Sequence, residues 1–130
     1  MKVIVAGSRE FTDYLFLKEQ LNEYRKDNTI TEIVSGMARG PDKLSLLYAL
    51  DNKIPVAKFP ADWDTYGKRA GPIRNEQMAK YADALVAFWD GVSRGTKNMI
   101  DQMTKQQKPV RIVWLLDAQR AWDGSNQKII

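Results

Sequence analysis

The stretch ALVAFWDGVSRGTKNMIDQM, residues 84–103, contains one complete strand–loop–helix unit and indicates the fold of the whole chain. Residues 84–88 are continuously apolar, which is typical of a strand buried on both faces of a parallel sheet. A loop with two glycines follows. Residues 95–107 then place Met99 and Met103 at helical spacing. This unit predicts a parallel sheet that is covered by helices.

The same unit recurs along the chain. Further short runs rich in β-branched residues predict strands at residues 2–6, 31–35, 55–59 and 109–115. Segments of helical period lie between them, at residues 13–27, 41–53 and 72–82. The alternation predicts an α/β protein: a Rossmann-like, doubly wound, parallel five-stranded sheet in a single three-layer domain. We assign this domain to residues 1–116 and a polar C-terminal tail to residues 117–130.

Three local features of these elements can be tested against a structure. Thr12 or Asp13 is placed to cap the first helix. The second helix is expected to turn Leu47 toward the sheet, together with Leu44 and Ala49. Residues 60–71 show no clear periodicity, which predicts an irregular loop of the kind that is often functional or mobile.

The composition excludes several classes of chemistry. The chain has 130 residues, no cysteine and no histidine. It therefore lacks disulfides, thiolate nucleophiles, histidine-based triads and most structural zinc sites. We expect no metal and no cofactor. The net charge of +4 suits an anionic small molecule. No apolar stretch is long enough to span a membrane, and the apolar run at the N-terminus is too short for a signal peptide, so we expect a cytoplasmic protein.

Glycine, arginine and tryptophan are concentrated in the loops that follow the first four predicted strands. Because the carboxyl ends of parallel strands meet at one edge of a sheet, these loops are expected to converge on one ligand site. The residues that we assign to this site from the loops are Gly7, Ser8, Arg9, Ser35, Gly36, Arg39, Gly40, Asp42, Trp63, Ser93, Arg94, Gly95 and Thr96. The helix that follows the third loop adds Arg74 and Asn75.

The loop before the last helix predicts a phosphate site. Gly91 and Gly95 allow the backbone to approach a ligand closely, and Ser93 can cap the helix. The N–H groups of Gly95 and Thr96 would then face the crevice, where the helix dipole favours an anion. The spacing matches neither a P-loop nor GxGxxG, and an ordinary capped turn is the alternative.

The other assigned residues have specific roles and equally specific alternatives. Arg39 can form a bidentate pair with phosphate, and Arg9 adds a guanidinium or is a plain surface arginine. Asp42 either accepts from a ribose hydroxyl or simply complements the helix dipole. Trp63 either stacks on a base or packs over the sheet edge.

Five motifs in order carry a resemblance to a known family. They are GSREFTD (7–13), SGMARGPD (35–42), FPADW (59–63), YGKRAGPIRNEQMA (66–79) and FWDGVSRGTKNMI (88–100). Together they resemble the YspA, cpYpsA-related branch of the SLOG superfamily over about residues 2–113. The resemblance implies a Rossmann-like domain that binds a nucleotide or a nucleotide-derived ligand. Distant relatives include cytokinin-activating phosphoribohydrolases and the DNA-processing protein DprA.

Comparison with the phosphoribohydrolase motifs bears on catalysis. Their RxxxM segment matches Arg74 and Met78, and the GT of their PGGxGTxxE segment matches Gly95 and Thr96. The glutamate of that segment falls on Met99, which cannot move a proton. An N-glycosidase would need another carboxylate, and we take Glu76 and Asp90 as candidates, with Asp13, Asp62 and Asp64 as further possibilities.

Three functions follow from these residues. The first is binding of a phosphoribosyl small molecule, such as a nucleotide, an ADP-ribose-like molecule or a cyclic signal, for sensing or sequestration. The second is N-glycosidic cleavage of that ligand. The third, less favoured because the net charge is small, is single-stranded nucleic-acid binding through Lys68, Arg69 and nearby aromatic rings. We also expect a homo-oligomer, which could pair through residues 14–16 or 99–103.

Overall fold

The computed structural model describes residues 1–115, and the predicted tail at residues 117–130 lies outside the described residues. The chain forms one parallel sheet with the strand order β3-β2-β1-β4-β5. Its strands are β1 (Lys2–Gly7), β2 (Glu32–Ser35), β3 (Val56–Lys58), β4 (Ala84–Trp89) and β5 (Val110–Trp114). Each predicted strand is confirmed within one residue at either end, because a continuous apolar run marks a strand buried on both faces.

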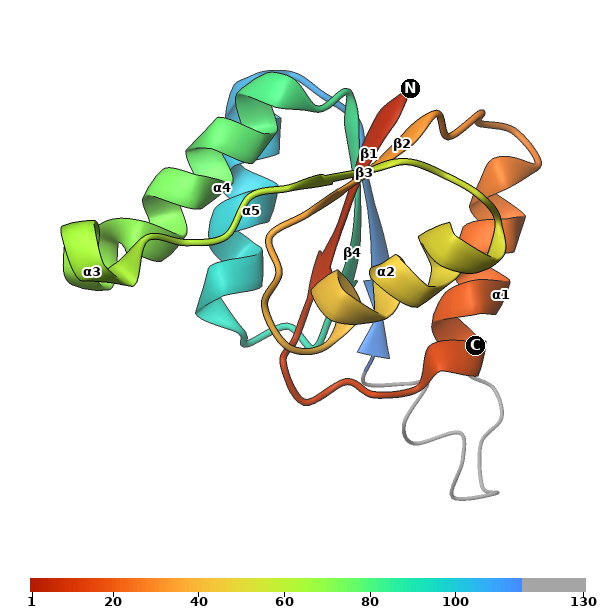
Figure 1. Ribbon diagram of the computed structural model, residues 1–130, viewed down its shortest axis with the longest axis horizontal. Helices are drawn as coiled ribbons and strands as arrows, with labels where there is room; N and C mark the ends of the chain where they lie inside the picture. Colours follow the sequence, from red (N-terminus) through yellow and green to blue (C-terminus); the bar gives the residue numbers. More distant parts are fainter. Residues whose placement is uncertain (116–130) are drawn as a thin grey trace.

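Helices cover both faces of the sheet (Figure 1). On one side lie α1 (Tyr14–Arg25) and α2 (Pro41–Asp51), and on the other lie α4 (Ala70–Tyr81) and α5 (Arg94–Lys105). The predicted three-layer α/β domain is therefore confirmed. None of the helices within residues 1–115 is long and apolar enough to cross a membrane.

The two faces of β1 belong to two separate hydrophobic clusters. Val3 and Val5 pack with residues of α1 and α2, whereas Ile4 packs with Met99 and Met103 of α5. This division follows from the alternation of side chains along a strand. Because Met99 and Met103 are in the core, they are not available to a partner chain.

The inward face of helix α2 differs in part from the one that its apolar residues predict. Ala49 is buried and Leu44 packs against the core, as predicted, but Leu47 is half-exposed and its predicted inward position is wrong; Ser45 and Tyr48 are buried in its place. The Ser45 hydroxyl donates to the Asp42 carbonyl, and Tyr48 donates to Asn22 of α1. Satisfied polar groups thus occupy the inward face, which a purely hydrophobic pattern does not reveal.

Residues 60–71 are more regular than predicted. They contain the short helix α3 (Trp63–Tyr66) and the 3-10 turn η1 (Gly67–Arg69), and α4 already begins at Ala70. The Asp62 carboxylate accepts from the Thr65 N–H at 3.1 Å and caps α3. One helical turn is too short to produce a periodic pattern, so the sequence did not indicate it. The first helix is capped by Asp13, one of the two predicted caps.

The central strands β1 and β4 create the crevice that positions the site. They are neighbours in the sheet, yet β1 leads to α1 on one face and β4 leads to α5 on the other. The loops after them therefore separate at the carboxyl edge of the sheet. Such a switch point is where open α/β sheets bind ligands.

Candidate functional site

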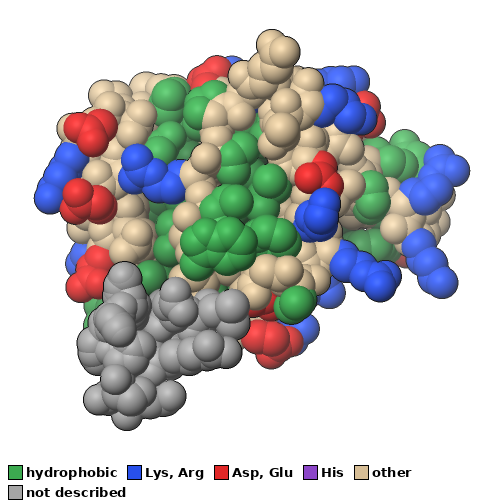
Figure 2. All heavy atoms as spheres, turned by 180° about the vertical axis from the view of Figure 1, so that it is seen from behind, with side chains coloured by type: hydrophobic (Ala, Val, Ile, Leu, Met, Phe, Trp, Pro, Cys, Tyr) green, Lys and Arg blue, Asp and Glu red, His purple; other side chains and the backbone are tan. Residues whose placement is uncertain are grey.

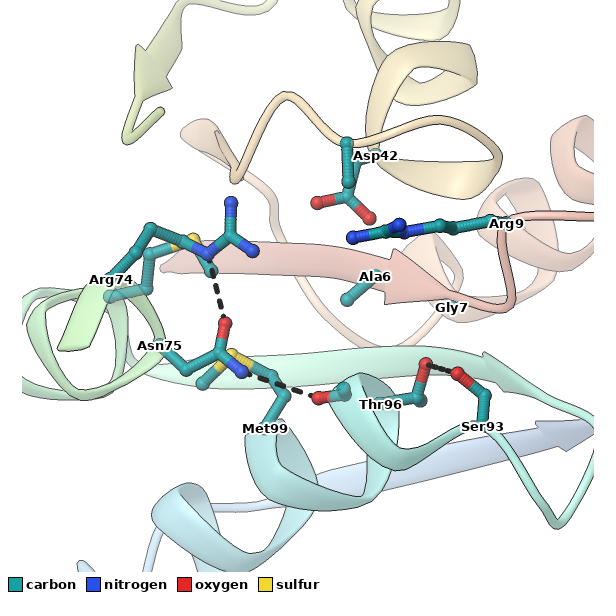
Figure 3. A pocket seen from close by; sticks show the side chains of 12 residues that line it. Ala6, Gly7, Arg9, Asp42, Arg74, Asn75, Ser93, Thr96 and Met99 are labelled. Carbon is teal, nitrogen blue, oxygen red and sulfur yellow. Dashed lines mark hydrogen bonds between the residues drawn. The ribbon is translucent and has the colours of Figure 1, made fainter. Parts of the chain in front are cut away.

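A cavity of about 230 Å³ lies at this switch point (Figure 3). It is bordered by the loop after β1, the first turns of α2 and α5, and helix α4. The assigned site residues that line it are Gly7, Arg9, Asp42, Arg74, Asn75, Ser93, Gly95 and Thr96. The sequence predicts that four loops converge. Three of them, the loops after β1, β2 and β4, meet at this cavity.

The loop after β1 is held against its neighbours by close backbone packing. A Cβ atom on Gly7 would collide with the Phe88 carbonyl oxygen and lie 2.7 Å from Pro41 Cγ. Ser8 is buried beneath the loop, and its hydroxyl accepts from the Asp90 N–H at 3.2 Å. Ser8 thus fixes the loop, and Arg9 is left to extend into the cavity.

Asp42 is the carboxylate that lines the cavity. Its residue is 5% exposed, and burial raises the pKa of its carboxyl to about 7, although Arg74 and the N–H groups of Ala38 and Gly36 act in the opposite direction. Such a carboxyl is only partly ionised at neutral pH. A strongly perturbed carboxyl in a cleft is a candidate functional group.

Gly36 allows Asp42 and Arg74 to approach the same loop. A Cβ atom on Gly36 would lie 2.8 Å from an Asp42 carboxylate oxygen and 2.7 Å from Arg74 Nη1. Real Cβ atoms essentially never show such distances, so any side chain here would have to displace the ends of the Asp42 and Arg74 side chains. Gly40 is also constrained, because its φ is +85° and a Cβ atom there would lie 2.6 Å from the Ser8 carbonyl oxygen.

Arg74 and Asn75 connect α4 to two loops. Arg74 donates through Nη1 to the Gly36 carbonyl and through Nε to the Asn75 side-chain oxygen at 3.0 Å. Asn75 donates to the Gly95 carbonyl at 3.2 Å and to Asn98. Burial lowers the pKa of the Arg74 guanidinium, which Asp42 opposes and Arg9 reinforces; an arginine nevertheless stays charged.

The first turn of α5 is open toward the cavity. Ser93 precedes the helix, but its side chain makes no capping bond to the backbone, so the predicted cap is wrong. Its hydroxyl instead lies 3.3 Å from the Thr96 hydroxyl. The indole N–H of Trp89 donates to the Ser93 carbonyl at 3.0 Å and fixes the start of the helix. The N–H groups of Gly95 and Thr96 are thereby left without a side-chain cap.

The carboxylates proposed for catalysis lie elsewhere. Glu76 is on the exposed side of α4, 3.6 Å from Lys80, and lines neither this cavity nor the one beside it. Asp90 accepts from the N–H groups of Val92 and Ser93. Burial acts to raise the pKa of Asp90, but these bonds outweigh it and lower the pKa. Asp90 therefore shapes the loop and does not face the cavity.

A second cavity of about 220 Å³ adjoins the first and shares Arg9, Ala38 and Arg74 with it. Trp63 forms part of its wall and is 51% exposed. Arg39 lines the same cavity, with its guanidinium 4.0 Å from the exposed Glu10 carboxylate. Stacking of a base on Trp63 stays a prediction.

Other assigned residues lie outside these two cavities. Ser35 is buried and donates to the Asp42 carbonyl at 2.9 Å. Arg94 is exposed on α5 and lines neither cavity. The sequence analysis assigns Asp42 no role in proton transfer. The sequence shows that an aspartate follows Pro41 after a glycine loop, but the surroundings of Asp42 include Arg74, which is distant in sequence.

The comparisons with known proteins agree with this fold and identify the family. The YspA, cpYpsA-related SLOG family (YAcAr) matches residues 1–66. The chain belongs to this family. The "Gene 61 protein" of Mycobacterium phage D29 is 30% identical over 116 residues, which cover 84% of this chain and 93% of that protein. SLOG membership suggests nucleotide-related binding at a Rossmann-like fold.

A solved structure supports the fold alone. DNA processing protein A (DprA) from Streptococcus pneumoniae superposes with a TM-score of 0.71 at 17% sequence identity. The match covers 97% of this chain but 57% of DprA. This SLOG chain therefore has the Rossmann-like architecture of one part of that longer protein.

Proposed function

We propose that the protein binds a nucleotide or a nucleotide-derived phosphoribosyl small molecule, for sensing or sequestration. Its phosphate would lie at the first turn of α5 between Arg9 and Arg74, and its base would occupy the second cavity against Trp63. One observation carries the proposal: two guanidiniums and an uncapped helix N-terminus border one cavity at the switch point.

The charges of the cavity favour an anion. Arg9 and Arg74 extend into it from opposite sides (Figure 3), and Asp42, with a pKa of about 7, carries less than a full negative charge at neutral pH. The N–H groups at the start of α5 add a positive potential. A phosphate would therefore meet net positive charge in a partly buried site, where such contacts are strong.

The second cavity supplies what a base requires. Trp63 offers an exposed aromatic face beside Arg39, and stacking of a base on such a ring contributes about 1–3 kcal/mol. Because Arg9, Ala38 and Arg74 border both cavities, the ribose would lie near these residues, within reach of Asp42.

Calorimetric titration with AMP, GMP, CMP and UMP, and with the matching nucleosides, tests the proposal. We expect at least one monophosphate to bind, and the Arg74→Gln variant to bind it about tenfold or more weakly, as loss of a charge-assisted bond predicts. Lys105→Gln, at the other end of α5, is the charge-matched control. Failure of all four monophosphates and of ADP-ribose to bind more tightly than about 1 mM would contradict the proposal.

The position of Asp42 favours a second candidate function, N-glycosidic cleavage of the same ligand. The carboxylate would accept a proton from the water that attacks the anomeric carbon. The bond to the base then breaks, and the proton passes to the departing base. A pKa near 7 suits both steps.

Chromatography for free base distinguishes cleavage from binding. Release by the wild-type chain, and its loss by about 10²-fold or more in Asp42→Asn while the ligand still binds, would support the enzyme. An intact ligand after prolonged incubation with a saturated wild-type protein would exclude it.

Single-stranded nucleic-acid binding remains a third candidate. The name of DNA processing protein A and the exposed aromatic rings of Trp63 and Tyr66 favour it. On the face of the described chain that Figure 2 shows, however, basic and acidic side chains are interspersed around an apolar centre. Steep loss of oligonucleotide affinity with added salt would support this function, and no binding at low salt would exclude it.

A further inference from the structure

A third cavity of about 340 Å³ lies on the other side of Arg9. Its wall combines an apolar part, Phe11 and Leu44, with a cationic part, Arg9, Arg39 and Lys43. The phosphate and base positions of the proposed function leave this cavity unused.

The three cavities are neighbours that share lining residues. Arg9 borders all of them, and Arg39 borders the second and the third. A molecule whose phosphate contacts Arg9 can therefore extend into the third cavity without leaving the surface. Each cavity alone is smaller than, or near the lower limit of, the sites that hold drug-sized ligands, which span about 300–1,000 Å³.

Positive charge dominates the third cavity. Its acidic residue is Glu10, whose side chain is 91% exposed and lies 4.0 Å from Arg39. An ion pair so exposed contributes little. Lys43 has no ion-pair partner within residues 1–115. The cavity therefore keeps an excess of positive charge beside an apolar wall, which suits a second phosphate that is attached to a sugar or a ring.

We propose that the ligand of this protein carries at least two phosphate groups. The second phosphate binds between Arg9, Arg39 and Lys43, and the group attached to it packs against the partly exposed Leu44. This inference rests on the proposed function and narrows its ligand from a mononucleotide to a molecule of dinucleotide type. The second phosphate can belong to a pyrophosphate bridge or to a phosphodiester.

Calorimetric titration of the full chain with AMP, ADP-ribose and the dinucleotide pApA tests the inference. AMP has one phosphate, ADP-ribose a pyrophosphate bridge, and pApA a phosphodiester in addition to its terminal phosphate. We expect at least one of the two larger molecules to bind about tenfold or more tightly than AMP, as one additional charge-assisted contact predicts. The molecule with the larger gain in affinity over AMP shows whether the second phosphate belongs to a pyrophosphate bridge or to a phosphodiester.

Three variants test which residues produce the higher affinity of the larger ligand. Lys43→Gln should remove most of the advantage of the larger ligand and change AMP affinity by less than about twofold. Arg9→Gln should weaken both ligands, because Arg9 borders every cavity. Lys105→Gln, far from the site, is the charge-matched control and should change neither.

The outcomes separate this inference from the function on which it rests. If AMP binds but neither larger molecule binds more tightly, or if Lys43→Gln weakens AMP and the larger ligand equally, the second phosphate site is refuted and mononucleotide binding stands. If none of the three binds more tightly than about 1 mM, the proposed function fails for adenine ligands, and this inference fails with it.

Discussion

Replacing Asp42 by asparagine tests the electrostatics of the cavity through the stability of the chain. Burial raises the pKa of the Asp42 carboxyl from 3.8 to about 7 in the folded chain, whereas an unfolded chain keeps a value of about 3.9. Between these values the folded chain holds a proton that the unfolded chain has released. The free energy of unfolding therefore falls as the pH rises from about 4 to 7.

The size of this effect follows from the two pKa values. A difference of about three in pKa corresponds to roughly 4 kcal/mol. Because Asp42 is 5% exposed, solvent screens the effect only weakly. The side chain at position 42 of the Asp42→Asn variant cannot ionise, so its free energy of unfolding does not fall for this reason as the pH rises. Relative to the wild type, its free energy of unfolding should rise by roughly 4 kcal/mol between about pH 4 and 8, at up to about 1.4 kcal/mol per pH unit.

Urea unfolding of both proteins across this pH range measures the difference directly. Other carboxylates titrate alike in both proteins and cancel, and the chain has no histidine. Asp64→Asn, at an exposed position in α3, is the matched control for the loss of an aspartate carboxylate. A difference between Asp42→Asn and wild type that stays constant from about pH 4 to 8 would refute the raised pKa.

Three further predictions follow from the site. Gly36→Ala should lower the free energy of unfolding by about 1–3 kcal/mol in urea titrations, because its Cβ would collide with Asp42 and Arg74; Gly95→Ala, where the space is open, should not destabilise the chain. Trp63→Ala should weaken a bound nucleotide by about 1–3 kcal/mol in calorimetry, and equal weakening of ribose 5-phosphate would contradict stacking. ADP-ribose affinity should fall as the pH rises through about 7, because Asp42 ionises there. The Asp42→Asn variant should lack this dependence. An affinity of the wild-type protein that does not change with pH would argue against contact between Asp42 and the ligand.

The sheet could be predicted closely because its strands are buried on both faces. An apolar run such as residues 84–88, followed by a loop with two glycines, has few other interpretations. In helix α2 the prediction failed at Leu47 alone, because Ser45 and Tyr48 use internal hydrogen bonds to lie inward. Helix α3 was missed because its single turn has no period. Local pattern therefore determined the elements better than it determined which of their faces are buried.

The loops of the candidate site could be predicted, but the chemistry within them could not. Glycine-rich loops after parallel strands must meet at one edge, so the positions of Arg9 and Gly95 followed from topology. Burial of Asp42 depends on Gly36 and on Arg74, which reaches the Gly36 carbonyl across 38 positions of sequence. Glu76 was a candidate only because it is a nearby carboxylate, and the phase of α4 turns it outward.

The hydrogen bond from the Trp89 indole to the Ser93 carbonyl gives the protein an intrinsic optical reporter. An anion at the first turn of α5 would change the electric field at this indole and shift its emission. A base stacked on Trp63 would instead quench emission from a second position. Because the chain has four tryptophans and the rings of Trp89 and Trp114 lie 5.3 Å apart, Trp89→Phe and Trp63→Phe variants would assign each signal, and label-free fluorescence then distinguishes a phosphate-only ligand from one that carries a base.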